Sequence, residues 1–401
     1  MSSSTVWISL VWDLKRKAKR NVELMWLTGR LAPDFKTIAD FRKNNGEAIR
    51  LVCREFVMLC RKLNLLSDTL AIDGSTFKAV NNRDKNFTKA KMKRRIAEVE
   101  ASIERYLDQL DDADDLAPAE DTRPIQEKIA ALEEEMDRLK KLEVRMLEAP
   151  DQQLSLTDPD ARSMKTRGQG VVGYNVQTAV DVDTHLIVAH EVTNIGIDRR
   201  QLSPMAIKGK EVLEADEPIK VIADQGYYRG EELLACEEAN ITAYVAKSET
   251  SGKRKKGEFS RRQFRYIAKD DEYECPAGER AIYRFTRNEA GKQIRRYWSS
   301  ACVRCPIKSR CTPSDYRRIS RWEHEAVVER AESRLTDYPE AMRVRRATVE
   351  HPFGTLKQWM GSTFLTRTIE NVGAEMILHV LAYNMKRAIS LVGTKKLIEA
   401  I

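Results

Sequence analysis

Hydrophobic positions repeat at two different periods along the chain, and these periods divide it into segments. In residues 1–66 the apolar side chains recur at helical spacing, as in Ile49, Val52 and Phe56. Asp34 follows a turn that contains Gly and Pro, and it is well placed to cap a helix. The pattern predicts a small helical module with a basic face. Such a module either packs as a cap on the main domain or contacts a partner.

Residues 88–150 carry two heptad seams. Apolar residues step by four and three from Met92 to Leu110, and again from Ile125 to Met146. The acidic segment between the seams, DDADDLAPAEDTRP, contains two prolines and is too long to continue a helix. The sequence therefore predicts an antiparallel helical hairpin. A coil formed between two chains is the alternative, but the two seams are so near in sequence that packing within one chain is favoured.

From Gly173 the period changes from helix to strand. Apolar residues alternate with polar ones on both sides of Asp183 and Thr184, which is typical of a β-hairpin. Short apolar runs at 69–75 and 219–224 predict two more strands, the first ending in an Asp and a Gly and the second in an Asp. A helix over 199–214, a turn and helix after Asp224 and the strand ITAYVA complete an α/β domain with a mixed sheet. Residues 323–392 are expected to be helical again.

Composition excludes several classes of protein. The 401 residues are 42% hydrophobic and 32% charged with few Gly and Pro, which excludes a disordered or fibrous chain. No apolar run is long enough to span a bilayer, so no membrane partner is expected. The positive charges at 15–20 follow the short apolar start instead of preceding it, which is the reverse of a secretory signal. We therefore expect a cytoplasmic location.

Candidate catalytic chemistry lies in three carboxylates. Asp73 and Asp224 are expected at the carboxyl ends of apolar strands, where α/β sheets present ligands. Two carboxylates brought together there repel each other unless a divalent cation compensates them, and oxygen ligands suit Mg²⁺ or Mn²⁺. A third acid, Glu350, shares one helix face with Arg346 and Lys357. The alternative without catalysis is that the two aspartates cap turns, and that Arg346, Glu350 and Lys357 form ion pairs on a solvent-exposed helix face.

Four of the seven cysteines have the spacing of a metal site. Cys275, Cys302, Cys305 and Cys311 form C-x26-C-x2-C-x5-C, which is typical of structural Zn²⁺. An iron–sulfur cluster and four unligated thiols are the alternatives. The other three, Cys53, Cys60 and Cys236, lie on apolar helix faces and are expected to be packing residues.

The net charge of +8 is modest, but its distribution is not even. Residues 247–266 hold eight Lys or Arg against two Glu, interspersed with Gly and Ser. This basic loop either solubilises the surface or lies on a nucleic-acid backbone. The residues with which it would do so are Lys253, Arg254, Lys255, Lys256, Arg261 and Arg262.

Four motifs in order, AIDGS, GYNVQTAVD, VIADQGYY and RRATVEHPFGTLK, resemble those of DDE transposases of bacterial insertion sequences. The resemblance covers roughly residues 20–390. It implies an RNase H-like mixed sheet flanked by helices, with Asp73, Asp224 and Glu350 as the Mg²⁺-binding triad. Arg346 and Lys357 match the R-x3-E-x6-K part of the family signature. Position 343 departs from the pattern, because it holds Arg where the family often has Tyr.

The residue patterns and the resemblance together give a domain plan, and the resemblance implies a set of partners. We expect a helical DNA-binding or dimerisation module, a split catalytic domain, a helical-hairpin insertion, an insertion with the basic loop and the four clustered cysteines, and a C-terminal helical part with Glu350. The expected bounds are, in that order, 1–66, 67–87 with 151–246, 88–150, 247–322 and 323–401. The partner would be double-stranded DNA, both the element ends and the target, bound by a homodimer or higher oligomer at the nucleoid.

Two other functions are compatible with the same residues. The first segment, MSSSTVWISLVWDLKRKAKR, does not resemble the start of the family, so the chain could be an inactive, N-terminally truncated copy. A protein of another class, a non-enzymatic DNA-binding protein built on the zinc knuckle, would not need its three acids to act together.

Overall fold

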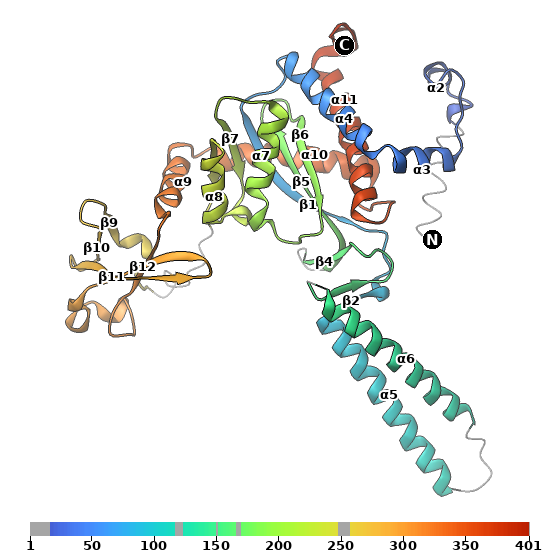
Figure 1. Cartoon of the computed structure of the whole chain (residues 1–401), viewed down its shortest axis with the longest axis horizontal. Helices are drawn as coiled ribbons and strands as arrows, with labels where there is room; N and C mark the ends of the chain where they lie inside the picture. Colours follow the sequence, from blue (N-terminus) through green and yellow to red (C-terminus); the bar gives the residue numbers. More distant parts are fainter. Residues whose placement is uncertain (1–16, 117–122, 150, 166–169, 248–256, 401) are drawn as a thin grey trace. The chain divides into compact units, whose positions relative to one another are not determined.

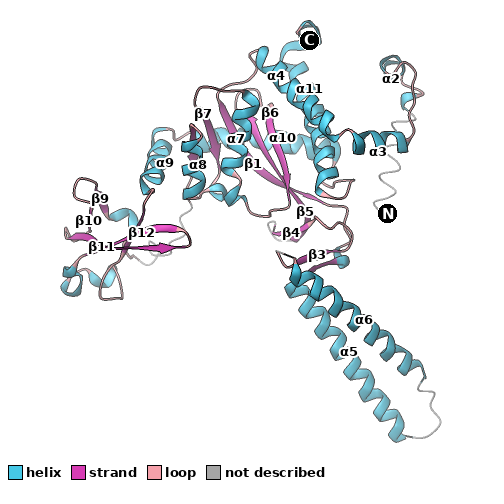
Figure 2. Ribbon diagram, viewed as in Figure 1, coloured by secondary structure: helices cyan, strands magenta, loops and turns pink. Residues whose placement is uncertain are grey.

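The computed structural model describes residues 17–116, 123–149, 151–165, 170–247 and 257–400 (Figures 1 and 2). The chain divides into two compact units. The first unit comprises residues 1–67, 73–197 and 348–401, and the second comprises 68–72 and 198–347. Strand β1 (Thr69–Lys78) and helix α10 (Ala341–Met360) each contribute residues to both units.

The main sheet is mixed, as the sequence predicts, with the strand order β4-β5-β1-β7-β8 and with β6 paired to β5. In the first unit β5 (Gly170–Asp181) pairs antiparallel with β4 (Arg162–Lys165) and with β6 (Ile187–Thr193), which confirms the predicted hairpin. In the second unit the first residues of β1 run parallel to β7 (Ile219–Ala223), and β7 runs parallel to β8 (Ile241–Val245).

The core of the first unit forms where helices pack on this sheet. Phe77 of β1 lies 5.4 Å, centroid to centroid, from Phe364, and Tyr174 of β5 meets Phe364 edge to face. Long helix α11 (Ile369–Glu399) packs on β6 and on α4 (Gly46–Lys62). Helices α2 (Val22–Leu27) and α3 (Phe35–Asn44) precede α4 in the sequence. The predicted cap of α3 is confirmed, since the backbone N–H of Thr37 donates to Oδ1 of Asp34 at 2.8 Å.

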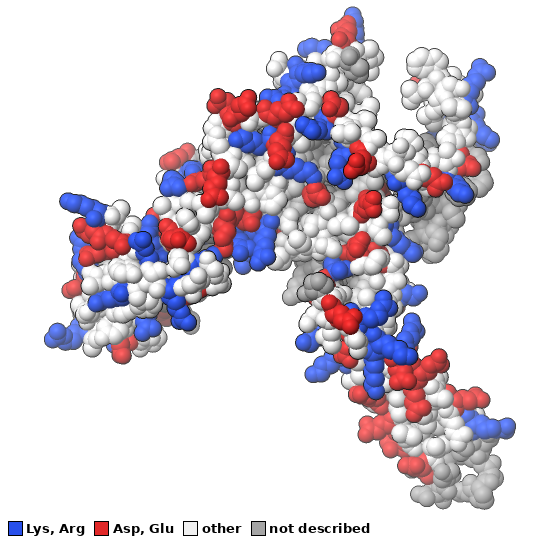
Figure 3. Space-filling view, in the orientation of Figure 1, with Lys and Arg blue, Asp and Glu red and all other residues white. Residues whose placement is uncertain are grey.

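Helices α5 (Lys89–Leu116) and α6 (Arg123–Glu148) form the predicted antiparallel hairpin, here called the arm. The heptad seam is buried between them at Met92, Val99, Leu139 and Met146. Short strands β2 (Asn86–Thr88) and β3 (Gln153–Ser155) pair antiparallel where the arm begins and ends. Lys and Arg gather near this paired end, and Asp and Glu gather toward the other end (Figure 3).

The second unit combines helices with a separate antiparallel sheet. Helices α7 (Leu202–Leu213), α8 (Gly230–Glu238) and α9 (Glu325–Asp337) agree with the predicted helices. Residues 257–322, here called the β-module, contain a sheet that the sequence did not indicate. Its strands, in the spatial order β13-β12-β11-β10-β9, are β13 (Ile319–Trp322), β12 (Lys292–Trp298), β11 (Arg280–Glu289), β10 (Glu272–Glu274) and β9 (Arg265–Ile267).

No helix in the described ranges combines the length and the apolar character that a membrane-spanning segment needs.

Candidate active site

Asp73 lies inside β1, not at its end. The apolar run Leu70, Ala71 and Ile72 is buried, but the strand continues through half-buried polar residues to Lys78, so the expectation that it ends at Asp73 is wrong. The reason is pairing, because β5 supplies hydrogen-bond partners to the polar half of the strand. The backbone N–H of Ala79 donates to Val172, and Thr178 Oγ1 donates to the carbonyl of Asp73 at 3.4 Å. The backbone at Asp73 is therefore fixed by the sheet.

Lys357 reaches β1 from α10. Its Nζ donates to Oγ of Ser75 at 2.6 Å and lies 5.0 Å from the centroid of the Phe77 ring. Burial lowers the pKa of Lys357, while the negative charge of Asp73 acts in the opposite direction. The first unit therefore brings together Asp73 and Lys357, two of the residues that the sequence singled out.

Glu350 is exposed and lies on the same helix, two turns before Lys357. The next residue, His351, packs against α11, with its Nδ1 3.0 Å from the hydroxyl of Tyr383. That hydroxyl donates to the carbonyl of His185 at 2.9 Å. Burial, and then the charge of Arg387, lower the pKa of His351. These contacts make His351 an anchor that fixes the rotation of α10 beside Glu350.

Asp224 directly follows β7, as the sequence predicts. It caps a single turn, Gln225–Tyr227, because the backbone N–H of Gly226 donates to Oδ1 at 2.7 Å. A Cβ at position 226 would lie 2.9 Å from that same oxygen, so that a larger residue here would displace the carboxylate of Asp224. The second oxygen, Oδ2, faces Nη2 of Arg345 at 3.7 Å.

Sequence reasoning missed Arg345. It selected the neighbouring Arg346, which matches the family spacing but is exposed, whereas the side chain of Arg345 is only 12% exposed. Consecutive residues on a helix point in directions about 100° apart. Helical spacing alone did not show which member of the Arg pair lies on the face toward Asp224.

The residues of the predicted active site are therefore divided between the two units. Asp73, Glu350 and Lys357 belong to the first unit, while Asp224, Arg345 and Arg346 belong to the second. Within the described ranges, no three side chains of Asp, Glu, His or Cys are close enough together to hold a metal ion as they stand. The donor atoms of the three acids are nevertheless carboxylate oxygens, the type that Mg²⁺ and Mn²⁺ prefer.

A family model described as "Transposase DDE domain" matches residues 145–385, which is more than half of the chain. The chain belongs to this DDE transposase family. Asp224, Arg346, Glu350 and Lys357 lie inside the match, whereas Asp73 lies before it. The mixed sheet flanked by helices agrees with the RNase H-like fold that the motifs imply. No curated protein and no solved structure matches the chain.

The predicted DNA-binding residues of this transposase-family chain are only partly within the described ranges. Lys253, Arg254, Lys255 and Lys256 lie outside them. Arg261 forms an ion pair with buried Glu325 at 2.8 Å, so that its charge also has a structural role. Arg262 is exposed. A DNA contact by these residues stays a prediction.

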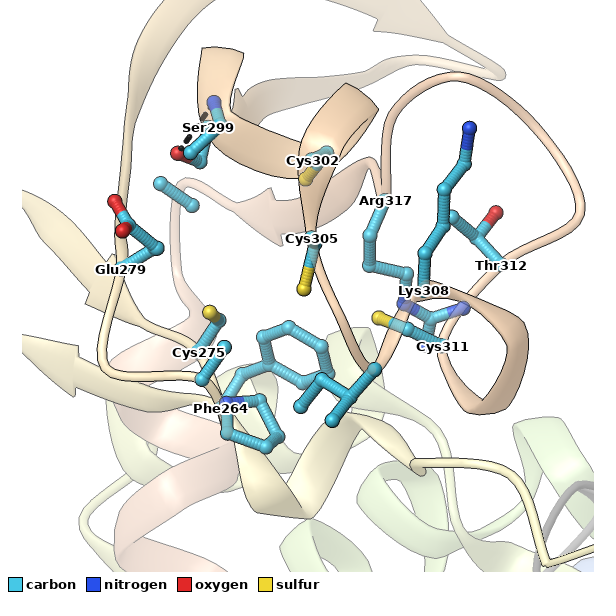
Figure 4. A pocket seen from close by; sticks show the side chains of 15 residues that line it. Phe264, Cys275, Glu279, Ser299, Cys302, Cys305, Lys308, Cys311, Thr312 and Arg317 are labelled. Atoms are coloured by element: carbon cyan, nitrogen blue, oxygen red, sulfur yellow. Dashed lines mark hydrogen bonds between the residues drawn. The ribbon is translucent and has the colours of Figure 1, made fainter.

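The cysteines fall into two groups. Cys53, Cys60 and Cys236 are buried, which confirms them as packing residues, and burial raises the pKa of each thiol to between about 11 and 12. Cys275, Cys302, Cys305 and Cys311 instead line one small cavity in the β-module (Figure 4). Burial raises the pKa of Cys311, Arg317 lowers it, and the other three cysteines raise it. The four thiols are thus near enough to interact.

Proposed function

We propose that the chain is a transposase that binds the terminal inverted repeats of its own element, cleaves DNA at the ends, and joins the 3′-hydroxyls to target DNA. Asp73, Asp224 and Glu350 form its metal-binding triad. Membership of the DDE family supports this function. The observation that carries the assignment is Lys357, which α10 places against β1 beside Asp73 while the same helix carries Glu350.

The family chemistry requires divalent metal, and the three acids supply suitable oxygen ligands. Mg²⁺ or Mn²⁺, when bound, activates the attacking water or 3′-hydroxyl and stabilises the leaving oxygen. Three residues of the chain itself, Gly226, Arg345 and Lys357, support this chemistry. The Gly226 N–H holds one oxygen of Asp224 in place, and Arg345 lies opposite the other. Lys357 offers a partly desolvated cation, which attracts phosphate oxygens more strongly than a fully hydrated one does.

The β-module is the surface that we assign to DNA. Residues 257–322 contain 16 Lys or Arg and 8 Asp or Glu, a net charge of +8 (16 − 8) that equals the net charge of the whole chain. Exposed aromatic side chains accompany the cations, since Tyr283 and Phe285 of β11 are each 45% exposed. Cations bind phosphates, and aromatic rings stack on bases. This combination fits a nucleic-acid backbone better than a surface that serves solubility alone.

The triad is tested by cleavage of a duplex that carries the genomic DNA flanking the coding region on both sides. With Mg²⁺ the wild-type protein should cut at the element ends, and Asp73→Asn, Asp224→Asn and Glu350→Gln should each lose roughly 1,000-fold or more. Asp68→Asn is the matched control, because Asp68 precedes β1 and pairs with Lys220 and Thr69 at the surface. Equal cleavage by the wild type and Asp224→Asn would refute the triad.

The DNA surface is tested separately, by binding at several salt concentrations. Arg280→Gln and Arg287→Gln remove exposed cations of β11, while Lys395→Gln removes a 92% exposed cation of α11. Each lost phosphate contact should lower the slope of log affinity against log salt by about 0.9. The β11 variants should show this change and the α11 variant should not. Identical slopes for all three proteins would refute the assignment of the surface.

A further inference from the structure

The β-module has a small hydrophobic core. Its buried cluster is formed by Phe264, Tyr273, Ala281, Tyr297 and Ile319. β11, its longest strand, buries only one of its ten residues. Small folds with so little core usually need a disulfide, a metal or another cross-link to be stable. All seven cysteines are free, so no disulfide supplies that link.

Four of those thiols gather at the edge of this core, from three separate turns. Cys275 follows β10, and the N–H of Gly278 closes its turn on the Cys275 carbonyl at 2.9 Å. Cys302 and Cys305 share the turn after β12, where the Cys305 N–H donates to the Cys302 carbonyl at 3.4 Å. Cys311 ends the next turn, and its N–H donates to the carbonyl of Lys308 at 2.9 Å. The fold has thus brought Cys275 together with three cysteines that lie 27 to 36 residues later in the sequence.

The cavity that they line is small, about 30 Å³, and two cations line it as well. In Figure 4 the four cysteines surround a common space, with the sulfur atoms of Cys305 and Cys311 directed into it. This volume is suited to a single ion or water and is too small for an organic cofactor. Arg317 and Lys308 lie at the same cavity, and the Arg317 Nε is buried without a hydrogen-bond partner in the described structure. Glu279 lines the cavity as well, so four neutral thiols leave its lining with a net charge of +1 (2 − 1). Four thiolates around a divalent ion would add a charge of −2 (−4 + 2), which the two cations can offset.

We propose that Cys275, Cys302, Cys305 and Cys311 bind one structural Zn²⁺, which cross-links the turn after β10 to the segment between β12 and β13. Four thiolates in tetrahedral geometry are a preferred ligand set of Zn²⁺. As the side chains stand in the described residues, no three of these cysteines are close enough together to hold a metal ion, so binding requires their sulfur atoms to converge. Rotation about the Cα–Cβ bond redirects a cysteine sulfur without moving the backbone. Binding releases the thiol protons and couples metal affinity to the folding of the β-module. This site does not depend on the proposed transposase activity.

Metal content is the direct test. Tag-free, full-length protein, reduced and purified without chelator, should contain one Zn²⁺ per chain by mass spectrometry of the metal. Cys305→Ser and Cys311→Ser should each fall below about a fifth of that content. Cys236→Ala is the matched control, since Cys236 is a buried thiol of α8 in the same unit and lies outside the cavity. The control should keep its zinc.

Two further measurements keep the proposal testable if the serine variants misfold. Co²⁺ exchanged into the wild type should show thiolate-to-metal charge-transfer absorption, which carboxylate ligands do not give. Chelation should make the Arg-rich β-module sensitive to trypsin, and added Zn²⁺ should restore its resistance. Wild-type protein without zinc after incubation with the metal, an iron–sulfur chromophore, or equal zinc loss in Cys236→Ala would each overturn the proposal. None of these readouts requires DNA cleavage, so failure here is distinct from failure of the proposed activity.

Discussion

Replacement of Gly226 by alanine should damage catalysis while leaving the fold intact. The new Cβ would lie 2.9 Å from Oδ1 of Asp224, whereas ordinary contacts begin at 3.4 Å. The carboxylate must therefore retreat by roughly 0.5 Å (3.4 − 2.9), because steric overlap at this distance costs more than rotation of the side chain. The Asp224 side chain is 42% exposed, so that it can move without disturbing the core.

The size of the effect follows from the contact that is lost. The Gly226 N–H donates to this oxygen at 2.7 Å, a charge-assisted bond of the kind that contributes about 1.5–3 kcal/mol. If that free energy holds the carboxylate in its reactive position, its loss corresponds to a rate decrease of about 10- to 100-fold. Because water can replace the N–H as the partner of this exposed carboxylate, the free energy of unfolding should fall by less than the full contribution of about 1.5–3 kcal/mol.

The assay is cleavage of the flanking-DNA duplex, together with thermal unfolding. Gly373→Ala is the control, since Gly373 lies in helix α11 with nothing within 4 Å of its Cβ position. Removal of a helical glycine should stabilise that protein by about 0.5–1 kcal/mol without slowing cleavage. The reasoning fails if Gly226→Ala cleaves within about twofold of the wild type while Asp224→Asn is inactive. It also fails if Gly226→Ala unfolds as readily as a core variant.

Three other substitutions test the first unit. Gly173→Ala places a Cβ 1.9 Å from the Phe77 carbonyl oxygen, which belongs to the backbone and cannot rotate away. Thermal unfolding should show a loss of about 3 kcal/mol or more, and a melting temperature equal to that of the wild type would contradict the close approach of β5 to β1. Lys357→Met keeps an unbranched apolar side chain but removes the ammonium group that donates to Ser75 and lies over Phe77, so cleavage should slow by roughly 100-fold with a smaller effect on stability. Unchanged cleavage by this variant would exclude Lys357 from the active site. Burial, followed by the charge of Arg42, lowers the pKa of His379 to about 4. As the pH falls, the unfolded chain, with a pKa near 6.5, takes up this proton before the folded chain does. In urea unfolding, His379 should therefore contribute a loss of about 2 kcal/mol between about pH 7.5 and pH 5, and His379→Gln should remove that share. The lowered pKa values of His185 and His351 add to the total loss in both proteins. Equal losses in both proteins would show that His379 is not the responsible group.

The sequence pattern predicted those elements in which buried residues recur at a regular spacing within one segment. The seam from Met92 to Met146 repeats every heptad, so that the arm could be derived from spacing alone. Asp224 could be placed because its strand ends where its apolar run ends. β11 could not be predicted, because nine of its ten positions are at least partly exposed and leave no alternating apolar signal.

The remaining differences came from contacts between distant parts of the chain. β1 extends beyond Ile72 only because β5, about a hundred residues later, offers hydrogen-bond partners. Likewise, the ion pair of Asp224 with Arg345 instead of Arg346 depends on the rotation of α10, which its contacts with α11 help to fix. Local propensity does not contain this information.

Both ends of the arm lie on the same pair of short strands, so that the length of the arm does not affect the geometry of the candidate active site. The arm leaves the chain at Thr88 and returns at Gln153, and these two residues are partners on one rung of the β2–β3 ladder. Because the connection closes on itself, the two helices can gain or lose matched heptads, about 10 Å of reach each, without shifting the register of any strand. Insertions or deletions of matched heptads in the arm should therefore leave Asp73, Glu350 and Lys357 where they are.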